Sequence, residues 1–404
     1  MGDPKDISIA LVNLPSPFLT DDLVIPPLGI MYLSSYLKAK GFENIRMVDL
    51  ASSRKVPSLD EDIIGISSTT PCFPEALRVL KKLGKYSKAH FVIGGPHATV
   101  SPMECQKKGF NQVVIGEGER AILKIVNGNR DSFIKEPLIP NLDSIPFPDR
   151  AGFPMAKYST SLEGRKATTM ITSRGCPFSC SFCCKVWGKG IRFRSYRNVL
   201  EEAALLREMG YEGIAFYDDE FFLNAKRDIK IAYGLKKLGF IWRCITRADF
   251  LTRRNLKIMK ECGCIGISLG IESGSNLILK NIRKGLTVED DKRAIERCNE
   301  LNIKVKGFFI VGLPGESTET LEATRNFIRK VKLDEAQFAV YTPYPGSDIY
   351  DNPRSYDISF KKGLKTWFVG KKGEYATSIR TSSLNSEQIL SFRDELEREF
   401  HGKK

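Results

Sequence analysis

A short run rich in β-branched residues, followed after three residues by three closely spaced cysteines, dominates this sequence. It reads Thr168-Thr169-Met170-Ile171-Thr172-Ser173-Arg174-Gly175-Cys176-Pro177-Phe178-Ser179-Cys180-Ser181-Phe182-Cys183. The β-branched run at residues 168–172 predicts a strand, and the cysteines follow it in the spacing C-x3-C-x2-C. Because loops after parallel strands form the ligand-binding edge of a sheet, we expect this loop to lie at a binding site.

Strand and helix patterns alternate after this segment. Five further units at about 30-residue spacing predict an open or partial (β/α)6 barrel, smaller than the complete eight-unit barrel. The predicted strands lie at residues 168–172, 213–217, 242–246, 266–270, 304–311 and 335–341. The predicted helices lie at residues 198–209, 226–238, 253–261, 288–301 and 318–331.

The preceding residues also alternate, which predicts an α/β fold with a doubly wound, Rossmann-like parallel sheet. Its strands are expected at residues 7–14, 45–50, 63–67, 91–93 and 112–115, with helices at 28–40, 74–83, near Met103 and at 119–126. Ligands bind such sheets at the carboxyl ends of the strands. The residues placed there are Ser67, Ser68, Thr69, Thr70, Gly94, Gly95, Pro96, His97, Gly116, Glu117, Gly118 and Glu119.

Four prolines between residues 136 and 150 exclude a regular helix and indicate a linker. We therefore expect a Rossmann-like domain at residues 1–135, a linker at 136–160, the partial barrel at 161–345 and a small extension at 346–404. A helix beginning near Ser383 and running toward Phe400 is expected in that extension, which is also the expected substrate-specific region.

The composition is that of a globular protein, with 42% hydrophobic and 27% charged residues among 404. No apolar run reaches the roughly 18 residues that span a bilayer, and no secretory signal begins the chain, so we expect a cytoplasmic protein without a membrane span. Ten cysteines are too few for a disulfide scaffold, and three histidines nearly exclude catalysis that needs several.

The net charge of +14 is concentrated in residues 151–345, which hold 33 Lys and Arg against 22 Asp and Glu. A basic field favours an anionic small molecule, an acidic protein or nucleic acid. No nucleic-acid-binding module accompanies the charge, so nucleic acid stays open but is disfavoured. A basic tract follows the cysteines directly and is either a site for an anion or acidic protein, or a solvated surface: Lys185, Lys189, Arg192, Arg194 and Arg197.

Three thiolates on one loop can hold three irons of a [4Fe-4S] cluster and leave the fourth iron open. A structural zinc site is the alternative, but it normally needs a fourth Cys or His, and the nearest histidine in sequence is His97. Unliganded buried thiols are the remaining alternative. Cys184 is expected to be structural, because adjacent residues rarely point to one metal.

This spacing, with the aromatic Phe182 before the third cysteine, resembles the signature of the radical S-adenosylmethionine (radical SAM) superfamily. The resemblance implies that Cys176, Cys180 and Cys183 ligate the cluster and that its open iron binds SAM. Residues at later strand ends resemble the family's SAM contacts, although solvated strand-end charges remain the alternative. They are Asp218, Asp219, Glu220, Arg247, Glu272 and Ser273, with Leu313 or Pro314 at the adenine.

The first domain resembles the cobalamin-binding module of the class B radical SAM methylases. The stretches that carry this resemblance are 26–29, 65–67, 92–98, 114–119 and the linker 142–150. Many cobalamin proteins supply an axial histidine after the first strand, but here residues 13–18 contain none. We expect the loop 67–71 to approach the lower face of the corrin. His97 either contacts the corrin periphery or nucleotide tail, or packs within its own loop.

These resemblances imply a cobalamin-dependent radical SAM enzyme of anaerobic conditions. It would transfer a methyl group from methylcobalamin to an unactivated carbon by way of a 5'-deoxyadenosyl radical. A cobalamin-dependent cyclase or rearrangement enzyme is the alternative. The expected partners are a small-molecule or peptide substrate, with anionic compounds among the candidates, and a flavodoxin or ferredoxin that supplies electrons.

Overall fold

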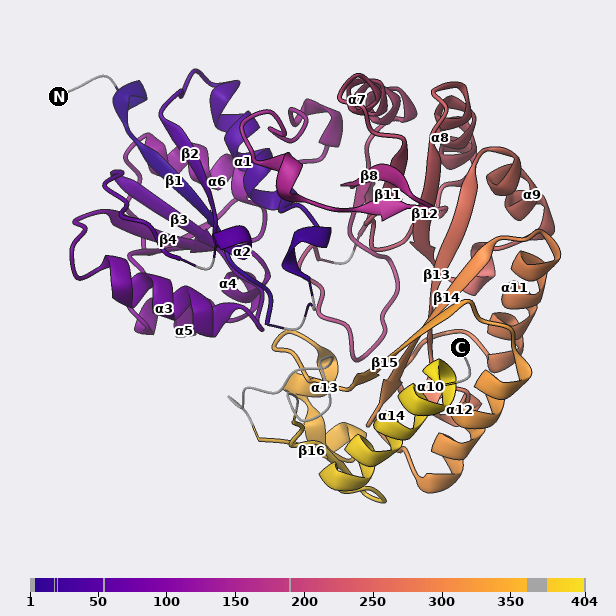
Figure 1. Cartoon of the computed structure of the whole chain (residues 1–404). Coiled ribbons are helices and arrows are strands. Elements are labelled where there is room, and N and C mark those ends of the chain that lie inside the picture. Colours follow the sequence, from indigo (N-terminus) through magenta and orange to yellow (C-terminus); the bar gives the residue numbers. More distant parts are fainter. Residues whose placement is uncertain are drawn as a thin grey trace. The chain divides into compact units, whose positions relative to one another are not determined.

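The chain divides into two compact units, Met1–Thr160 and Ser161–Lys404 (Figure 1). The computed structural model describes residues 4–402 except Phe18, Thr20, Arg54, Lys189 and residues 362–375. Each unit is built around one mainly parallel sheet. No helix in this described part of the chain is long and apolar enough to cross a membrane.

The first unit is a six-stranded parallel sheet in the order β2-β1-β3-β4-β5-β6. Its strands are β1 (Ile9–Asn13), β2 (Ile45–Asp49), β3 (Ile63–Ser67), β4 (His90–Gly94), β5 (Gln112–Ile115) and β6 (Phe133–Lys135). Its helices are α1 (Leu28–Lys38), α2 (Leu50–Ser53), α3 (Phe73–Leu83), α4 (Pro96–Val100), α5 (Pro102–Lys107) and α6 (Gly118–Val126).

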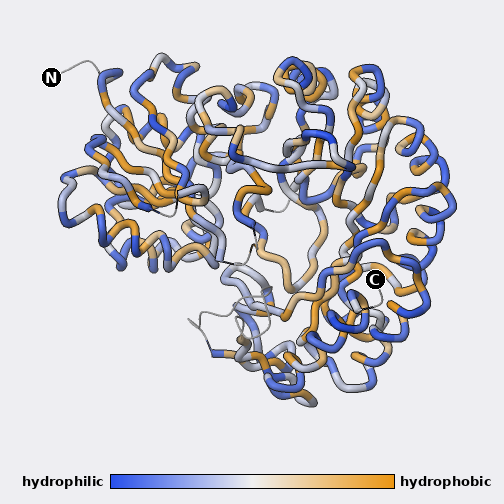
Figure 2. Tube along the Cα trace, viewed as in Figure 1, coloured by the Kyte–Doolittle hydropathy of each residue, from blue (hydrophilic) through white to orange (hydrophobic). Residues whose placement is uncertain are grey.

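Helices cover both faces of this sheet, with α1 and α6 on one and α3 and α5 on the other (Figure 1). The inner strands β1, β3 and β4 are buried on both sides and largely apolar, whereas the edge strands β2 and β6 are partly exposed. In β1, Ile9 to Val12 are each no more than 1% exposed. Figure 2 shows the same concentration of hydrophobic residues along the strands. Burial of both faces therefore explains the doubly wound fold.

Residues of the proline-rich segment pack on the first unit. The backbone N–H of Ile139 donates to Glu117 at 2.7 Å, and Asp149 accepts hydrogen bonds from Ser34 at 2.7 Å and Lys38 at 2.6 Å. Only short 3-10 turns form here, Leu142–Ser144 and Met155–Lys157, as expected where proline removes backbone donors.

The second unit is a curved seven-stranded sheet in the order β15-β14-β13-β12-β11-β8-β7. Only β7 is antiparallel to its neighbour, and β15 and β7 form the two edges, so this sheet is an open barrel. The strands are β7 (Ser161–Leu162), β8 (Arg165–Met170), β11 (Gly213–Phe216), β12 (Ile241–Thr246), β13 (Cys264–Glu272), β14 (Lys304–Val311) and β15 (Glu335–Val340).

Helices line the outer side of this sheet (Figure 1). They are α7 (Tyr196–Glu208), α8 (Ala225–Lys237), α9 (Arg253–Glu261), α10 (Asn276–Asn281), α11 (Val288–Glu300) and α12 (Thr318–Lys330). Beyond β15 come α13 (Asp348–Asp351), the short pair β16 (Ile358–Ser359) and β17 (Arg380–Thr381), and α14 (Ser386–His401). α14 packs against β15, where Arg393 Nε donates a hydrogen bond to the Phe338 carbonyl at 3.0 Å.

The predicted fold class is confirmed, including the doubly wound first sheet, the partial barrel and the helical carboxyl end. Several short elements of two to six residues escaped prediction. They include β6, α10 and the antiparallel pair of β9 (Ser173–Arg174) with β10 (Arg192–Phe193), which brackets the cysteine loop.

Candidate functional site

The cysteine loop begins at the carboxyl end of the strand segment β8–β9 and returns through β10. Gly175 has φ +97°, a conformation that side chains disfavour. A Cβ on it would also overlap the carbonyl oxygen of Gly190. Glycine is therefore needed immediately before Cys176 to let the two arms of the loop approach each other.

The three cysteines of the motif are free thiols. Burial raises the pKa of Cys183 to about 12, and the neighbouring charges of Cys180 and Cys176 add to the shift. Among the described residues, no three His, Cys, Asp or Glu side chains are close enough to hold a metal ion as they stand. A [4Fe-4S] cluster binds each cysteine to a different iron, so three separated free thiols on one loop fit that group.

Buried charges hold the base of this loop. Asp218, after β11, accepts hydrogen bonds from the Thr172 backbone and hydroxyl, both at 2.5 Å, and from the Ser173 hydroxyl at 2.8 Å. Arg194, after β10, forms a 2.5 Å ion pair with Glu202 of α7. The side chain of Asp218 thus fastens the polypeptide before the cysteines, and its oxygens are occupied by protein donors.

Arg194 belongs to the basic tract after the cysteines, for which a solvated surface was one of the two expectations. Its side chain is only 6% exposed. Arg197 of the same tract is exposed, and Lys185 donates to the Ser179 hydroxyl at 3.2 Å. Lys189 lies outside the described residues. The tract is therefore divided between an internal anchor and surface cations.

Asp219 and Glu220 lie nearer the thiols. The carboxylate of Asp219 accepts the Gly175 backbone N–H at 3.2 Å, and both acidic residues raise the pKa of Cys176, after burial as the largest cause. Glu220 accepts from the Thr246 hydroxyl at 2.6 Å and the Arg247 backbone at 2.7 Å. Burial raises the pKa of Glu220 to about 7.

Arg247 and Glu272 also meet at the carboxyl edge, through a residue that the sequence analysis missed. Lys284 forms a 3.0 Å ion pair with Glu272, and its carbonyl accepts the Arg247 guanidinium at 2.9 Å. The Arg247 guanidinium lies 3.7 Å from the ring centroid of Phe178 within the cysteine loop. A lone lysine in the loop before α11 gives no sequence signal of this contact.

The other candidates of the second unit have different environments. Ser273 is fully buried, with its hydroxyl 3.2 Å from that of Thr324. Leu313 is also fully buried, and its backbone N–H donates to Glu316 at 3.2 Å. Phe182 is half-buried.

The start of the carboxyl-terminal extension holds the cysteine loop from the other side. The Cys184 thiol lies 3.2 Å from the Pro345 carbonyl, and the Ile349 backbone N–H donates to the Ser181 carbonyl at 3.1 Å. Arg283 pairs with Asp348. Cys184 is therefore engaged with protein, and this part of the extension supports the loop.

In the first unit, the predicted strand-end loops lie side by side. The Ser68 backbone donates to the Gly94 carbonyl, and the His97 backbone donates to the Ser68 carbonyl, both at 3.0 Å. Gly95 has φ +92°, and a Cβ there would lie 3.0 Å from the Ser68 carbonyl oxygen. Gly116 donates to the Thr99 hydroxyl at 3.0 Å. The loops after β3, β4 and β5 thus form one continuous edge.

His97 is 3% exposed at this edge, with Nδ1 3.2 Å from the Thr70 hydroxyl. Burial lowers its pKa to about 4, so the imidazole is neutral at neutral pH. The Thr69 hydroxyl contacts the Cys72 thiol at 3.1 Å, and Ser67 is half-buried. Glu117 is occupied by its bond to Ile139, and a Cβ on Gly118 would lie 2.9 Å from the Leu33 side chain.

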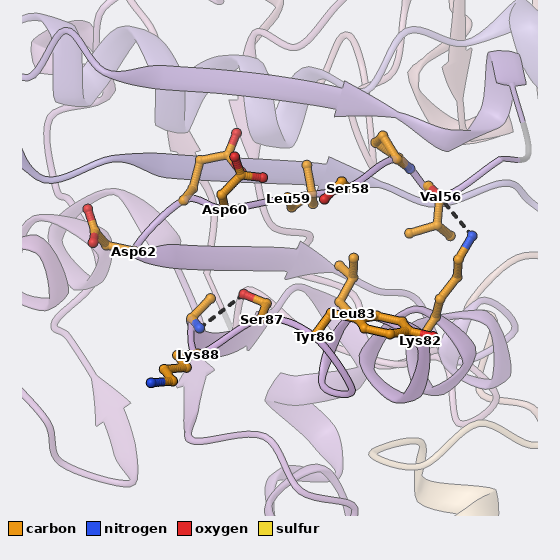
Figure 3. A pocket seen from close by; sticks show the side chains of 13 residues that line it. Val56, Ser58, Leu59, Asp60, Asp62, Lys82, Leu83, Tyr86, Ser87 and Lys88 are labelled. Carbon is orange, nitrogen blue, oxygen red and sulfur yellow. Dashed lines mark hydrogen bonds between the residues drawn. The ribbon is translucent and has the colours of Figure 1, made fainter.

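A pocket of about 620 Å³ lies at the opposite, amino edge of the same sheet (Figure 3). It is bordered by the loop before β3, with Val56 and Asp60, and by the end of α3 with Lys82 and Tyr86. Because parallel sheets bind ligands at the carboxyl edge, this pocket is separate from the predicted cofactor edge.

Comparisons with known proteins identify both modules. The model of the radical SAM superfamily matches residues 170–328, and that of the B12 binding domain matches residues 19–126. An uncharacterized methyltransferase of Pyrococcus horikoshii is 35% identical over 407 residues, covering 91% of this chain and 87% of that protein. An anaerobic magnesium-protoporphyrin IX monomethyl ester cyclase of Rubrivivax gelatinosus is 31% identical, covering 80% of this chain and 66% of that protein.

Among solved structures, the radical S-adenosylmethionine methyltransferase TsrM of Kitasatospora setae, with cobalamin and a [4Fe-4S] cluster bound, superposes with a TM-score of 0.72. The sequences are 15% identical, and the match covers 96% of this chain and 89% of TsrM, so it supports the fold. The cofactors of the matched modules are a [4Fe-4S] cluster, SAM and cobalamin. Since both modules and a similar methyltransferase match most of its length, the chain belongs to the cobalamin-dependent (class B) radical SAM methyltransferase family.

Proposed function

We propose that this chain methylates an unactivated carbon of a small-molecule or peptide substrate, with Cys176, Cys180 and Cys183 as the cluster ligands. The loop itself carries the proposal: three free thiols follow a left-handed turn that only a glycine, Gly175, accommodates. The Asp218 hydrogen bonds and the Arg194 ion pair fix the base of the loop, so its donors are oriented before any metal arrives.

SAM is a zwitterion with a ribose, and the edge around the loop offers matching groups. We assign its amino group to Asp219, which has one protein hydrogen bond through Oδ2, and its carboxylate and ribose to Arg247 and Glu272. Phe178 and Arg247 stack and help exclude water from that side. In this proposal Asp218 and Ser273 do not contact SAM; their hydrogen bonds to Thr172, Ser173 and Thr324 fix the backbone around the site.

For cobalamin, we assign the edge formed by residues 67–70, 94–97 and 116–118. Small residues and the left-handed Gly95 let a bulky ring approach the backbone there. His97 is neutral and bonded to Thr70, which suits a contact with the corrin periphery. When bound, cobalamin supplies the methyl group, and the reduced cluster supplies the electron that cleaves SAM.

Anaerobic reconstitution tests the cluster assignment. Iron and sulfide should bind to the parent protein and be lost in Cys176→Ala, Cys180→Ala and Cys183→Ala. Cys184→Ala is the matched control, because that neighbouring thiol contacts the Pro345 carbonyl, and it should keep its iron. Equal iron loss in all four variants would contradict the assignment.

Product analysis tests methyl transfer. Cobalamin-loaded protein given SAM and a reductant should form S-adenosylhomocysteine, and cobalamin-free protein should not. Formation of 5'-deoxyadenosine alone, in the presence of substrate, would instead support the cyclase-type alternative suggested by the Rubrivivax relative. A substrate that gains one methyl group distinguishes the two outcomes by mass.

The electron donor in this proposal is an acidic flavodoxin or ferredoxin. Exposed Arg197 and Lys230 flank the Tyr196 ring at the start of α7, close in sequence to the cysteine loop. Such a surface attracts an acidic protein by long-range charge. Reduction by the carrier should slow as salt is added, whereas reduction by a small neutral reductant should not.

A further inference from the structure

Lys284 is an ion-paired lysine buried at the edge where the cysteine loop and β13 meet. Its side chain is 6% exposed and that of Glu272 is 9% exposed, with 3.0 Å between the ammonium and carboxylate. Burial alone would lower the pKa of Lys284, but the charges of Glu272 and Cys180 raise it above its usual value. The ammonium is therefore charged. Lys284 lies next to the cysteine loop, because its carbonyl accepts the Arg247 guanidinium, which packs on the ring of Phe178.

The backbone of β13 is shaped around this pair. Glu272 has φ +67°, a strained value for a residue with a side chain, and the register between β13 and β14 shifts between Gly270 and Glu272. A Cβ on Gly270 would lie 2.5 Å from the Glu272 carboxylate and 2.9 Å from the Lys284 ammonium. The backbone conformation of Glu272, the register shift and the missing side chain of Gly270 together leave space for the Glu272 carboxylate and the Lys284 ammonium.

A second carboxylate faces the same charges without a partner. Asp291 of α11 is 0% exposed, and neither of its oxygens has a hydrogen-bond partner in the described structure. Burial raises the pKa of Asp291 to about 8, although the charge of Lys284 acts in the opposite direction, so this acid is mainly protonated at neutral pH. Buried polar groups without partners are uncommon in folded proteins, so Asp291 marks an incompletely satisfied site beside Lys284.

We infer that Lys284 is a positioning residue of the SAM and cluster site, where it orients Glu272 toward SAM and places a buried positive charge beside the cysteine loop. The inference rests on the proposed roles of Cys180 and Glu272. Reduction adds negative charge to the cluster, and a nearby buried cation stabilises that state. The same ammonium fixes the carboxylate that receives the ligand, so one residue affects both reduction and SAM binding.

Redox titration of the reconstituted cluster, followed by electron paramagnetic resonance, tests the charge effect. Lys284→Gln should shift the midpoint potential to a more negative value, and Glu272→Gln should shift it to a less negative value. Lys284→Arg keeps the charge and should stay near the parent. The matched control is Lys304→Gln, which removes an exposed lysine paired with Glu163 and should change nothing.

Equilibrium dialysis with SAM provides a readout that needs no turnover. Lys284→Gln should weaken SAM binding about tenfold or more, because a charge-assisted contact loses its orientation, and Lys284→Arg should recover part of the loss. Opposite signs of the two potential shifts cannot come from general structural damage. If Lys284→Gln loses its iron, the midpoint potential of Glu272→Gln decides: a less negative value supports the inference, and a more negative value overturns it.

Parent-like potential and SAM affinity in Lys284→Gln would overturn the inference while leaving the proposed function intact. A shift of the same sign in Lys284→Gln and Glu272→Gln would also overturn it. Absence of iron from the parent protein would instead refute the proposed function, and this inference with it.

Discussion

The ion pair between Arg194 and Glu202 yields a quantitative prediction about the base of the cysteine loop. Both side chains are buried, at 6% and 3% exposure, and Arg194 also donates to Asn198 at 2.7 Å and to the Ile171 carbonyl at 2.9 Å. Arg194→Met would leave the Glu202 carboxylate buried without its cation. Removing one member of such a pair costs about 3 to 5 kcal/mol of unfolding free energy.

Two further variants separate this electrostatic cost from simple loss of a side chain. Arg194→Met/Glu202→Leu removes both charges and should recover most of the stability, because an apolar pair of similar volume is often as stable as a buried ion pair. Arg253→Met breaks an exposed pair with Glu300, whose side chains are 70% and 51% exposed, and should cost about 0 to 1 kcal/mol.

Denaturant unfolding followed by tryptophan fluorescence suits this test, because all three tryptophans lie in the Ser161–Lys404 unit. Iron content after reconstitution should fall in parallel, since Arg194 anchors the return arm of the loop. The reasoning is refuted if the double variant is less stable than Arg194→Met, or if Arg253→Met costs as much.

Three other predictions address single positions. Burial raises the pKa of Glu316 to about 8, so as the pH rises this carboxyl ionises at a lower pH in the unfolded chain than in the folded one. The free energy of unfolding of the parent should therefore fall between about pH 4.5 and 8, by on the order of 4 kcal/mol relative to Glu316→Gln. Melting experiments at a series of pH values measure this difference. Gly175→Ala should lower both the iron content and the thermal stability, and the strain of the left-handed turn alone should cost about 1 to 2 kcal/mol of unfolding free energy. Gly190→Ala is the control and should change neither, because a Cβ on Gly190 would meet open space. Tyr158→Phe removes a 3.1 Å bond to Asp49 and should cost about 1 kcal/mol in unfolding experiments on the first unit; no change would show that water replaces it.

Periodicity was sufficient to predict both sheets because their strands are buried and their helices amphipathic. Strands such as Ile63–Ser67 and Lys304–Val311 agree with the predicted ranges. Pairing of β9 with β10 was not predictable, since two-residue strands have no periodicity and their register depends on Gly175 and Gly190 lying close together. Short elements are fixed by tertiary contacts, which a local pattern does not contain.

The sequence supplies candidate site residues where a motif names them, as the cysteine spacing does, and their role as cluster ligands stays a prediction. Lys284 could not be found this way, because its role depends on a loop between α10 and α11 folding back onto Glu272. Asp291 resembled any acid in the first turn of a helix, where such residues are common. Only the structure shows that it is fully buried.

Asp218 shows why sequence position alone does not assign a role among adjacent acids. Three acids follow β11, and the strand ends there, so each was an equal candidate for SAM. In the structure, three protein donors satisfy Asp218, whereas Asp219 has one backbone donor. A carboxylate already satisfied by protein gains little from a ligand amino group, because that contact would replace existing hydrogen bonds. We therefore propose Asp219 rather than Asp218 as the SAM contact, and Asp218→Asn should impair cluster retention more than SAM affinity.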